Sequence, residues 1–223
     1  MRKGNLIAIV FISLLFACKN PNGMNGVESE SGGIGNGTMS KQSLTPGEYV
    51  KWVRDEQHGL KKEKTIEDIV FSAQYKPAEY AICTEEKKGK LEDTLVKREK
   101  KDLEGMQYFD FKIGLRKGEG ELLKYDLSSK EEYDKRVNYF SFNMQKDIQL
   151  VDGQDTIPCS LFHFERAYDV TPNSVFELGF APGKNSTGNK TLIYHDNIFR
   201  KGIIKLEFEN KDLSDVPQLE TEK

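Results

Sequence analysis

The sequence predicts an α+β fold, with a single domain that has N-terminal helices and a mostly antiparallel, β-rich C-terminal half. Three observations support this prediction. Two helix-capping sequences and a Lys/Glu-rich segment lie before residue 135. Five apolar segments follow residue 147 and are separated by Gly, Pro, Asn and Asp, as in a series of β-hairpins. Strands and helices do not alternate regularly, which argues against a parallel sheet with crossover helices.

The first helix is expected to begin at Pro46. Thr45 and Glu48 form a capping box, in which each side chain accepts a backbone amide of the first turn, and proline is favoured at the first helical position. The helix continues through Val53. We expect it to end at Gly59, because glycine readily adopts the left-handed conformation that commonly ends helices.

Residues 69–115 combine strand and helix patterns. Apolar residues alternate with polar ones at 69–75 and 107–115, which predicts two half-buried strands. Between them, Pro77 can open a helix through Ile82, with a second strand as the alternative. Residues 87–104 are rich in Lys and Glu, and we interpret them as a helix with a solvated face.

The C-terminal half begins with a helix and continues as strands. Ser129 and Glu132 form a second capping box. The apolar residues that follow it have the spacing of an amphipathic helix, and they are Tyr133, Val137, Phe140 and Met144. Strands are expected at 148–151, 156–168, 175–180, 190–194 and 202–208.

The N-terminal segment has the features of a signal peptide. Arg2 and Lys3 precede the run Leu6–Phe16, which is apolar except for one serine. This length fits the apolar region of a signal peptide and is too short for a membrane span. The sequence Leu15-Phe16-Ala17-Cys18 resembles a lipobox, the motif at which signal peptidase II cuts bacterial lipoproteins. The resemblance implies that residues 1–17 are removed and that acylated Cys18 anchors the chain in a lipid bilayer; the alternative is a free cysteine near an ordinary cleavage site.

The lipobox sets the expected organisation of the rest of the chain. Residues 18–44 are the lipidated cysteine and a flexible tether, because 19–44 contain six glycines and no aromatic residue and have little apolar surface to bury. The folded domain is expected at 45–217, followed by a polar tail at 218–223. In lipoproteins of enteric bacteria, an acidic residue directly after the cysteine is the signal for retention in the inner membrane. Lys19 occupies this position here and is basic. The resemblance therefore favours the outer membrane and its periplasmic face, with cell-surface display as the alternative.

The charge of the chain gives no reason to expect a nucleic-acid partner. The chain has 33 basic and 36 acidic residues, and removal of Arg2 and Lys3 leaves 31 basic residues against 36 acidic ones. No basic patch stands out in the sequence. Charged residues make up 31% of the chain and the mean hydropathy is −0.63, as expected for a solvated surface around a modest core.

No motif predicts a catalytic residue, a cofactor or a metal. The segment GFAPGKNSTGNKT (179–191) contains a Gly-Lys pair, but its spacing and the residue after Lys184 do not match a phosphate-binding loop, so we expect a hairpin loop. His163 and Glu165 lie on one face of a strand and offer only two metal ligands. We expect His163 to be partly buried among its phenylalanine neighbours. His195 and Asp196 are expected at a turn.

Four residues are candidate modification sites. Cys83 and Cys159 are able to form a disulfide in an oxidising compartment, and the alternative is that both are buried free thiols. Asp93-Thr94-Leu95 and Asp155-Thr156-Ile157 resemble the Asp-Thr-aliphatic O-glycosylation motif of exported Bacteroidota proteins. This resemblance implies modification at Thr94 or Thr156.

Longer phrases also resemble known sequences. PGEYVKWV, QYKPAEY, PCSLFHFER and LIYHDNIF are similar to phrases in uncharacterised Bacteroidota lipoproteins of about 200 residues, a resemblance that brings no activity. We expect a non-enzymatic, lipid-anchored accessory or protein-binding lipoprotein of the outer membrane, with another envelope protein as its partner. One alternative is a small-ligand binder whose pocket is lined by Phe162, Phe164, Phe176 and Phe180. The other is an envelope hydrolase that uses Cys159, His163 and Glu165.

Overall fold

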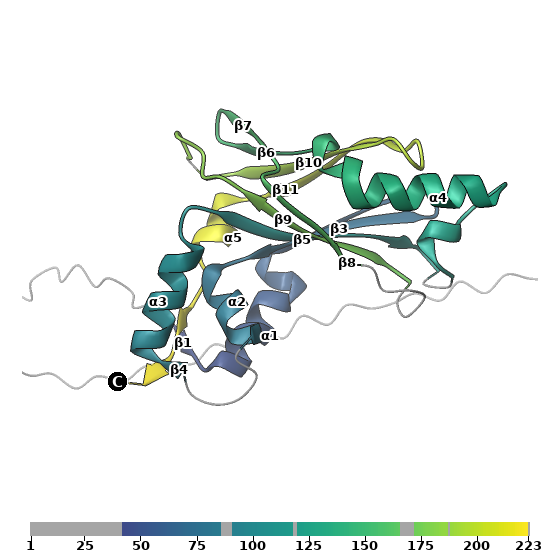
Figure 1. The fold of residues 1–223 in the computed structure, drawn as a ribbon. Coiled ribbons are helices and arrows are strands. Elements are labelled where there is room, and N and C mark those ends of the chain that lie inside the picture. Colours follow the sequence, from purple (N-terminus) through teal and green to yellow (C-terminus); the bar gives the residue numbers. More distant parts are fainter. Residues whose placement is uncertain (1–41, 86–90, 118–119, 166–171, 187, 223) are drawn as a thin grey trace, which may run out of the picture. The chain divides into compact units, whose positions relative to one another are not determined.

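The computed structural model shows an α+β fold with mostly antiparallel sheets, as the sequence predicts. It describes residues 42–85, 91–117, 120–165, 172–186 and 188–222. Cys18 and most of the expected tether lie outside the described residues. Helices and strands are not separated into two halves of the chain, because three strands of the larger sheet come from its first half. Figure 1 shows the arrangement of the elements.

The larger sheet has five strands in the order β2-β3-β5-β9-β8, and every neighbouring pair is antiparallel. Its strands are β2 (Lys61–Ile66), β3 (Ile69–Lys76), β5 (Gln107–Leu115), β9 (Ser174–Phe180) and β8 (Leu161–Glu165). The strands expected at 69–75 and 107–115 are confirmed. The sequence analysis missed β2, because its sequence KKEKTI is polar and it pairs only along one edge.

The smaller sheet packs its buried face against the larger one. Its order is β11-β10-β6-β7, all antiparallel. The strands are β11 (Gly202–Phe208), β10 (Lys190–Asp196), β6 (Ile148–Asp152) and β7 (Asp155–Pro158). Aromatic rings meet between the sheets, with ring centroids 5.3 Å apart for Phe109 and Phe208 and 5.4 Å apart for Phe111 and Tyr194. The main hydrophobic core therefore lies between the two sheets.

The chain crosses from one sheet to the other at Cys159 and Ser160. The Cys159 amide donates to the Ile148 carbonyl in the smaller sheet (3.4 Å), and the Ser160 amide donates to the Gly179 carbonyl in the larger sheet (2.9 Å). The single strand expected at 156–168 is therefore two strands, β7 and β8, in different sheets. The loop after Phe180 is likewise a crossover and not the expected hairpin, because β9 and β10 belong to different sheets.

A helix covers part of the core between the sheets. It consists of α4 (Lys130–Asn138), a π-helical turn (Tyr139–Asn143) and a 3₁₀ turn (Met144–Asp147). The predicted cap at Ser129 is confirmed, because its hydroxyl accepts the Glu132 amide at 3.2 Å. The Glu132 carboxylate accepts the amide of Ser128 instead of Ser129. Phe140 is fully buried, and its ring centroid lies 5.1 Å from that of Phe176.

Three further helices lie on the side of the larger sheet away from the smaller one (Figure 1). They are α1 (Pro46–Arg54), α2 (Ala78–Glu85) and α3 (Asp93–Leu103). The capping box of Thr45 and Glu48 is confirmed, and the segment after Pro77 is a helix. The first helix ends at Arg54, earlier than expected. Gly59 ends the 3₁₀ turn Glu56–His58 instead, with a φ of +70° that favours glycine.

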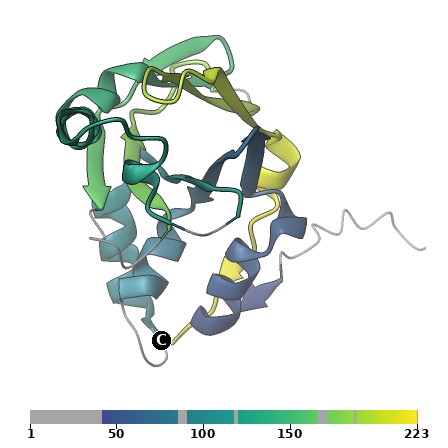
Figure 2. The same cartoon turned by 90° about the vertical axis from the view of Figure 1, so that its right-hand side faces the viewer.

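The C-terminal residues belong to the folded domain. After α5 (Asn210–Ser214), strand β12 (Gln218–Leu219) pairs in parallel with β1 (Ser43–Leu44), and β13 (Thr221–Glu222) pairs in parallel with β4 (Leu91–Glu92). Figure 2 shows this C-terminal segment beside α1. Together with α1, α2 and α3 it encloses a second hydrophobic cluster. The structure therefore extends the folded domain beyond the expected limits 45–217 at both ends. It includes β1 before residue 45 and most of the expected polar tail after residue 217.

Candidate functional site

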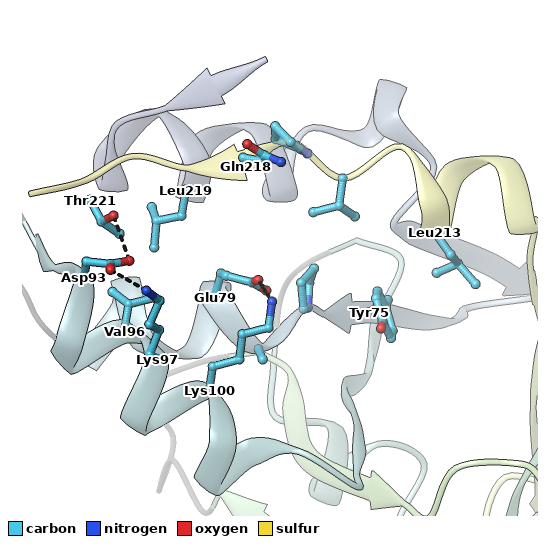
Figure 3. A pocket seen from close by; sticks show the side chains of 14 residues that line it. Tyr75, Glu79, Asp93, Val96, Lys97, Lys100, Leu213, Gln218, Leu219 and Thr221 are labelled. Carbon is cyan, nitrogen blue, oxygen red and sulfur yellow. Dashed lines mark hydrogen bonds and ion pairs between the residues drawn. The ribbon is translucent and has the colours of Figure 1, made fainter. Parts of the chain in front are cut away.

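A groove with a volume of about 630 Å³ lies between α2, α3 and the C-terminal segment (Figure 3). Its apolar lining comes from all three: Ala78 of α2, Val96 of α3, and Val216 and Leu219 of the C-terminal segment. Tyr75, at the end of β3, also lines the groove. We refer to it below as the C-terminal groove.

One face of α3 forms a wall of the C-terminal groove. Asp93, Val96, Lys97 and Lys100 all line it, and their spacing of three and four residues places them on one side of the helix. The opposite wall is formed by residues 216–221, which include strand β12 and the start of β13. The C-terminal groove is therefore bounded by the helix α3 on one side and by the C-terminal segment, with its backbone groups, on the other.

The charged side chains in the C-terminal groove are paired with one another. Lys100 forms an ion pair with Glu79 across α2 and α3, and Lys97 pairs with Asp93 at 2.6 Å (Figure 3). The Thr221 hydroxyl donates to Asp93 at 3.4 Å. The two acidic and two basic side chains cancel, so recognition of a ligand here depends on apolar contact and hydrogen bonds more than on net charge.

Among the residues that the structure describes, the backbone edge of β12 is unpaired at Leu219. The amides of Gln218 and Glu220 donate to the carbonyls of Gln42 and Leu44, at 2.9 and 2.8 Å. Successive residues of a strand turn their backbone N–H and C=O groups to opposite edges. The amide and carbonyl of Leu219 therefore face away from β1, on the side of β4. Within the described part of the chain, no residue forms a backbone hydrogen bond with them.

Tyr75 adds a hydrogen-bond donor to the apolar lining of this groove. Burial raises the pKa of Tyr75, and the nearby carboxylate of Glu79 raises it further. The phenol therefore stays protonated at neutral pH, so its hydroxyl is able to donate a hydrogen bond.

Cys83 and Cys159 are not joined by a disulfide in the structure, which corresponds to the alternative of two buried free thiols. Both are free buried thiols, and they lie in different hydrophobic clusters, Cys83 among the helices and Cys159 in the core between the sheets. Burial raises the pKa of each thiol to about 11. The Cys159 thiol donates to the Leu161 carbonyl at 3.0 Å. Neither cysteine is an activated nucleophile, because the thiolate is scarce at neutral pH.

The other residues of the hydrolase alternative do not form a site with Cys159. His163 and Glu165 share one face of β8, as predicted, but both are exposed. The expectation that His163 is partly buried among phenylalanines is wrong, because Phe162 and Phe164 face the opposite side, toward the core. Among the residues that the structure describes, no group of three or more His, Cys, Asp or Glu side chains is placed to hold a metal ion.

The four phenylalanines proposed as a ligand pocket pack against other aromatic rings: Phe162 and Phe164 against Phe176, and Phe180 against Phe109. Phe176 and Phe180 are fully buried. The rings of Phe164 and Phe176 stack with centroids 5.0 Å apart, and that of Phe162 lies 5.8 Å from Phe176. Phe176 and Phe180 therefore belong to the core between the sheets, and Phe162 and Phe164 pack against it.

The Gly-Lys loop at 179–191 binds a carboxylate of the protein itself. Asp152 is fully buried and accepts a hydrogen bond from the Ser186 hydroxyl at 2.8 Å and from the Gly183 amide at 3.4 Å. The ammonium group of Lys190 lies 2.9 Å from the same carboxylate. Gln107 donates to it from β5 at 3.0 Å. Three groups of this loop and its following strand, the Gly183 amide, the Ser186 hydroxyl and the Lys190 ammonium group, are thus directed to Asp152.

The sequence analysis did not find the C-terminal groove. A detectable signal was the apolar residue Leu219 in the segment expected to be a polar tail, three residues after Val216 at the expected end of the domain. Thr94, on α3, and Thr156, on β7, are exposed, and their modification stays a prediction. No helix in the described part of the chain is both long and apolar enough to cross a membrane. Comparison with models of protein families, with curated proteins and with solved structures found no match.

Proposed function

We propose that the chain is a lipid-anchored lipoprotein of the outer membrane whose folded domain binds an extended segment of another envelope protein. The domain acts as an accessory or docking module and not as an enzyme. The observation that carries this proposal is the C-terminal groove, which combines apolar walls with the unpaired backbone edge at Leu219.

The groove fits an extended peptide in size and chemistry. Its volume of about 630 Å³ is within the range of about 300–1,000 Å³ that is usual for ligand sites. A peptide laid beside Leu219 satisfies the free amide and carbonyl, as in recognition by strand addition, and its alternate side chains then contact the apolar walls. The paired charges of Glu79 and Lys100 at the groove impose no strong preference for the sign of the peptide's charge.

The proposed anchor places this domain near a bilayer. A flexible chain of 24 residues, the length of 19–42 before β1, has a typical span of roughly 27 Å. Acylated Cys18 therefore holds the domain close enough to meet envelope proteins without pressing it onto the membrane. The periplasmic face of the outer membrane is the favoured location, and the cell surface is the alternative.

Replacement of Cys18 tests the anchor. Cys18→Ala is expected to leave an unlipidated protein that no longer partitions with membranes, because the acyl chains supply the membrane affinity. The measurement is fractionation of cells that express wild-type or variant protein, followed by mass spectrometry of the N-terminus. An unchanged share of Cys18→Ala in the membrane fraction contradicts the anchor.

Groove variants test the docking site. A photo-crosslinking residue at Lys97, beside the groove, is expected to capture an envelope protein that the same residue at Lys205, on the exposed face of β11, does not capture. Peptides from the captured segment are then titrated against the purified protein. Val216→Glu is expected to weaken peptide binding at least tenfold, because it places a charge on an apolar wall, whereas Ile203→Glu on exposed β11 leaves it unchanged.

A second variant separates strand addition from simple apolar contact. Leu219→Pro removes the free amide at this position and leaves the donors of Gln218 and Glu220, which bind β1, in place. Leu219→Ala, which deletes most of the same apolar side chain and keeps the amide, is the matched control. Strand addition predicts a larger loss of peptide affinity in Leu219→Pro than in Leu219→Ala, with thermal unfolding as the check that β12 still pairs. Equal crosslinking at Lys97 and Lys205, or full affinity in Val216→Glu, contradicts the groove as the docking site.

A further inference from the structure

A second recess lies between α1, α2 and the outward face of the larger sheet. Its volume is about 460 Å³. Basic residues from three elements line it, and they are Arg54 of α1, Lys61 of β2 and Lys112 of β5. One acidic residue, Asp110, also lines it. We refer to it as the basic recess.

The acid in the basic recess is already neutralised. The carboxylate of Asp110 lies 2.9 Å from the ammonium group of Lys76. Burial lowers the pKa of Lys76, but the hydrogen bond to Asp110 and the charges of Asp110 and Glu177 together raise it by more, so the pKa lies above its ordinary value and the pair stays ionised. The positive charges of the recess are therefore not cancelled by its one carboxylate.

The basic residues keep donors available. Among the described residues, Lys61 forms an ion pair with Glu56 alone, whose side chain is 73% exposed, so this pair lies at the surface and is weak. Arg54 donates from Nε to the Tyr80 hydroxyl at 2.8 Å, which leaves its two terminal nitrogens without a partner among the described residues. The side chain of Lys112 forms no hydrogen bond or ion pair within the described ranges. Glu63 and Glu165 are further carboxylates on this face of the sheet. Each lies two strands away from Lys112, Glu63 on β2 and Glu165 on β8.

Neutral side chains in the basic recess are held in place and complement the charges. The Gln74 amide nitrogen donates to the carbonyls of Val53, Leu60 and Tyr75 at 3.0–3.1 Å, which fixes the orientation of this side chain. Its oxygen is then left as an acceptor. The Tyr80 hydroxyl accepts from Arg54 and keeps its own proton to donate.

We propose that the basic recess binds a small oxyanion, a carboxylate or phosphate, carried by a hydroxyl-bearing molecule such as an acidic sugar. The terminal nitrogens of Arg54 form the planar fork that suits such oxyanions, and Lys112 supplies a second positive charge. Gln74 and Tyr80 offer an acceptor and a donor to the hydroxyl groups. This site is separate from the C-terminal groove and does not depend on peptide docking.

Titration of the detergent-solubilised full-length protein tests the proposal by calorimetry. Glucuronate supplies the carboxylate, glucose 6-phosphate the phosphate, and glucose the neutral control. At least one anion is expected to bind at least tenfold more tightly than glucose, and to bind more weakly as salt increases. Which of the two binds identifies the oxyanion. Absence of millimolar binding by both anions overturns the proposal.

Variants locate the binding. Lys112→Gln is expected to lower the affinity at least fivefold without loss of stability, because its side chain is exposed and has no described partner. Arg54→Gln is expected to lower it further, and Arg54→Lys to restore part of the loss. Lys205→Gln, on the exposed face of β11, is the matched control and leaves the affinity unchanged. An equal loss in Lys205→Gln and Lys112→Gln shows non-specific charge binding and overturns the assignment to the basic recess.

Discussion

Asp152→Ala is expected to lower the free energy of unfolding by about 3–5 kcal/mol. Asp152 is fully buried, and Lys190, Ser186, Gln107 and the Gly183 amide all donate to it or pair with it. Removal of the carboxylate leaves the Lys190 ammonium, whose side chain is only 10% exposed, without its ion-pair partner. The cost therefore arises from an uncompensated buried charge as well as from lost hydrogen bonds.

Urea unfolding followed by circular dichroism measures this loss. Asp134→Ala is the matched control, because Asp134 is an exposed aspartate on α4, and its effect is expected to stay within about 0.5 kcal/mol. The double variant Asp152→Ala with Lys190→Met removes both charges and is expected to be more stable than Asp152→Ala alone. A double variant that is less stable than the single one contradicts an unpaired Lys190 as the main cause.

The same carboxylate gives stability a defined pH dependence. Burial raises the pKa of Asp152, but the hydrogen bonds from Lys190 and Ser186 lower it by more, so the pKa lies below its ordinary value. A group with a depressed pKa stabilises the fold at pH values above its unfolded pKa of about 3.9, and this contribution is lost as the pH falls through the folded pKa. The stability difference between wild type and Asp152→Asn is therefore expected to shrink below about pH 4.

Local features of the fold were predictable from the sequence, because the residues that determine them are neighbours. The capping box of Thr45 and Glu48 spans four residues, and the strands at 69–75 and 107–115 show their own alternation. The end of the first helix was predicted wrongly, because Gly59 is explained by a contact with a residue distant in the sequence as well as by a turn. A Cβ atom at Gly59 would lie 2.0 Å from the Asp212 carboxylate, so this glycine is required by a distant contact as well as by its φ of +70°.

The pairings that build the candidate site could not be predicted, because they join distant segments. Thr221 pairs with Leu91, and Gln218 pairs with Ser43, across most of the chain. Short strands of two residues carry no periodic pattern that separates them from a polar tail. The crossover at Cys159 was hidden for a similar reason, since the apolar run continues through it while the hydrogen bonds change from one sheet to the other.

Phe140→Ala is expected to lower the free energy of unfolding by about 3–5 kcal/mol, because truncation of a fully buried phenylalanine removes apolar contact and leaves a cavity. Its ring meets those of Phe164, Phe176 and Phe199, with centroids 5.7, 5.1 and 6.3 Å away. These partners come from β8, β9 and the loop after β10, so one side chain joins both sheets to the helix.

Phe142 provides a control in the same π-helical turn. Residues two apart on a helix point to nearly opposite sides, and Phe142 is 74% exposed whereas Phe140 is fully buried. Phe142→Ala deletes the same atoms but is expected to change the free energy of unfolding by no more than about 0.5 kcal/mol. Urea unfolding of the two variants measures the difference. Similar losses for both, or a loss confined to Phe142→Ala, contradict the placement of Phe140 in the core between the sheets.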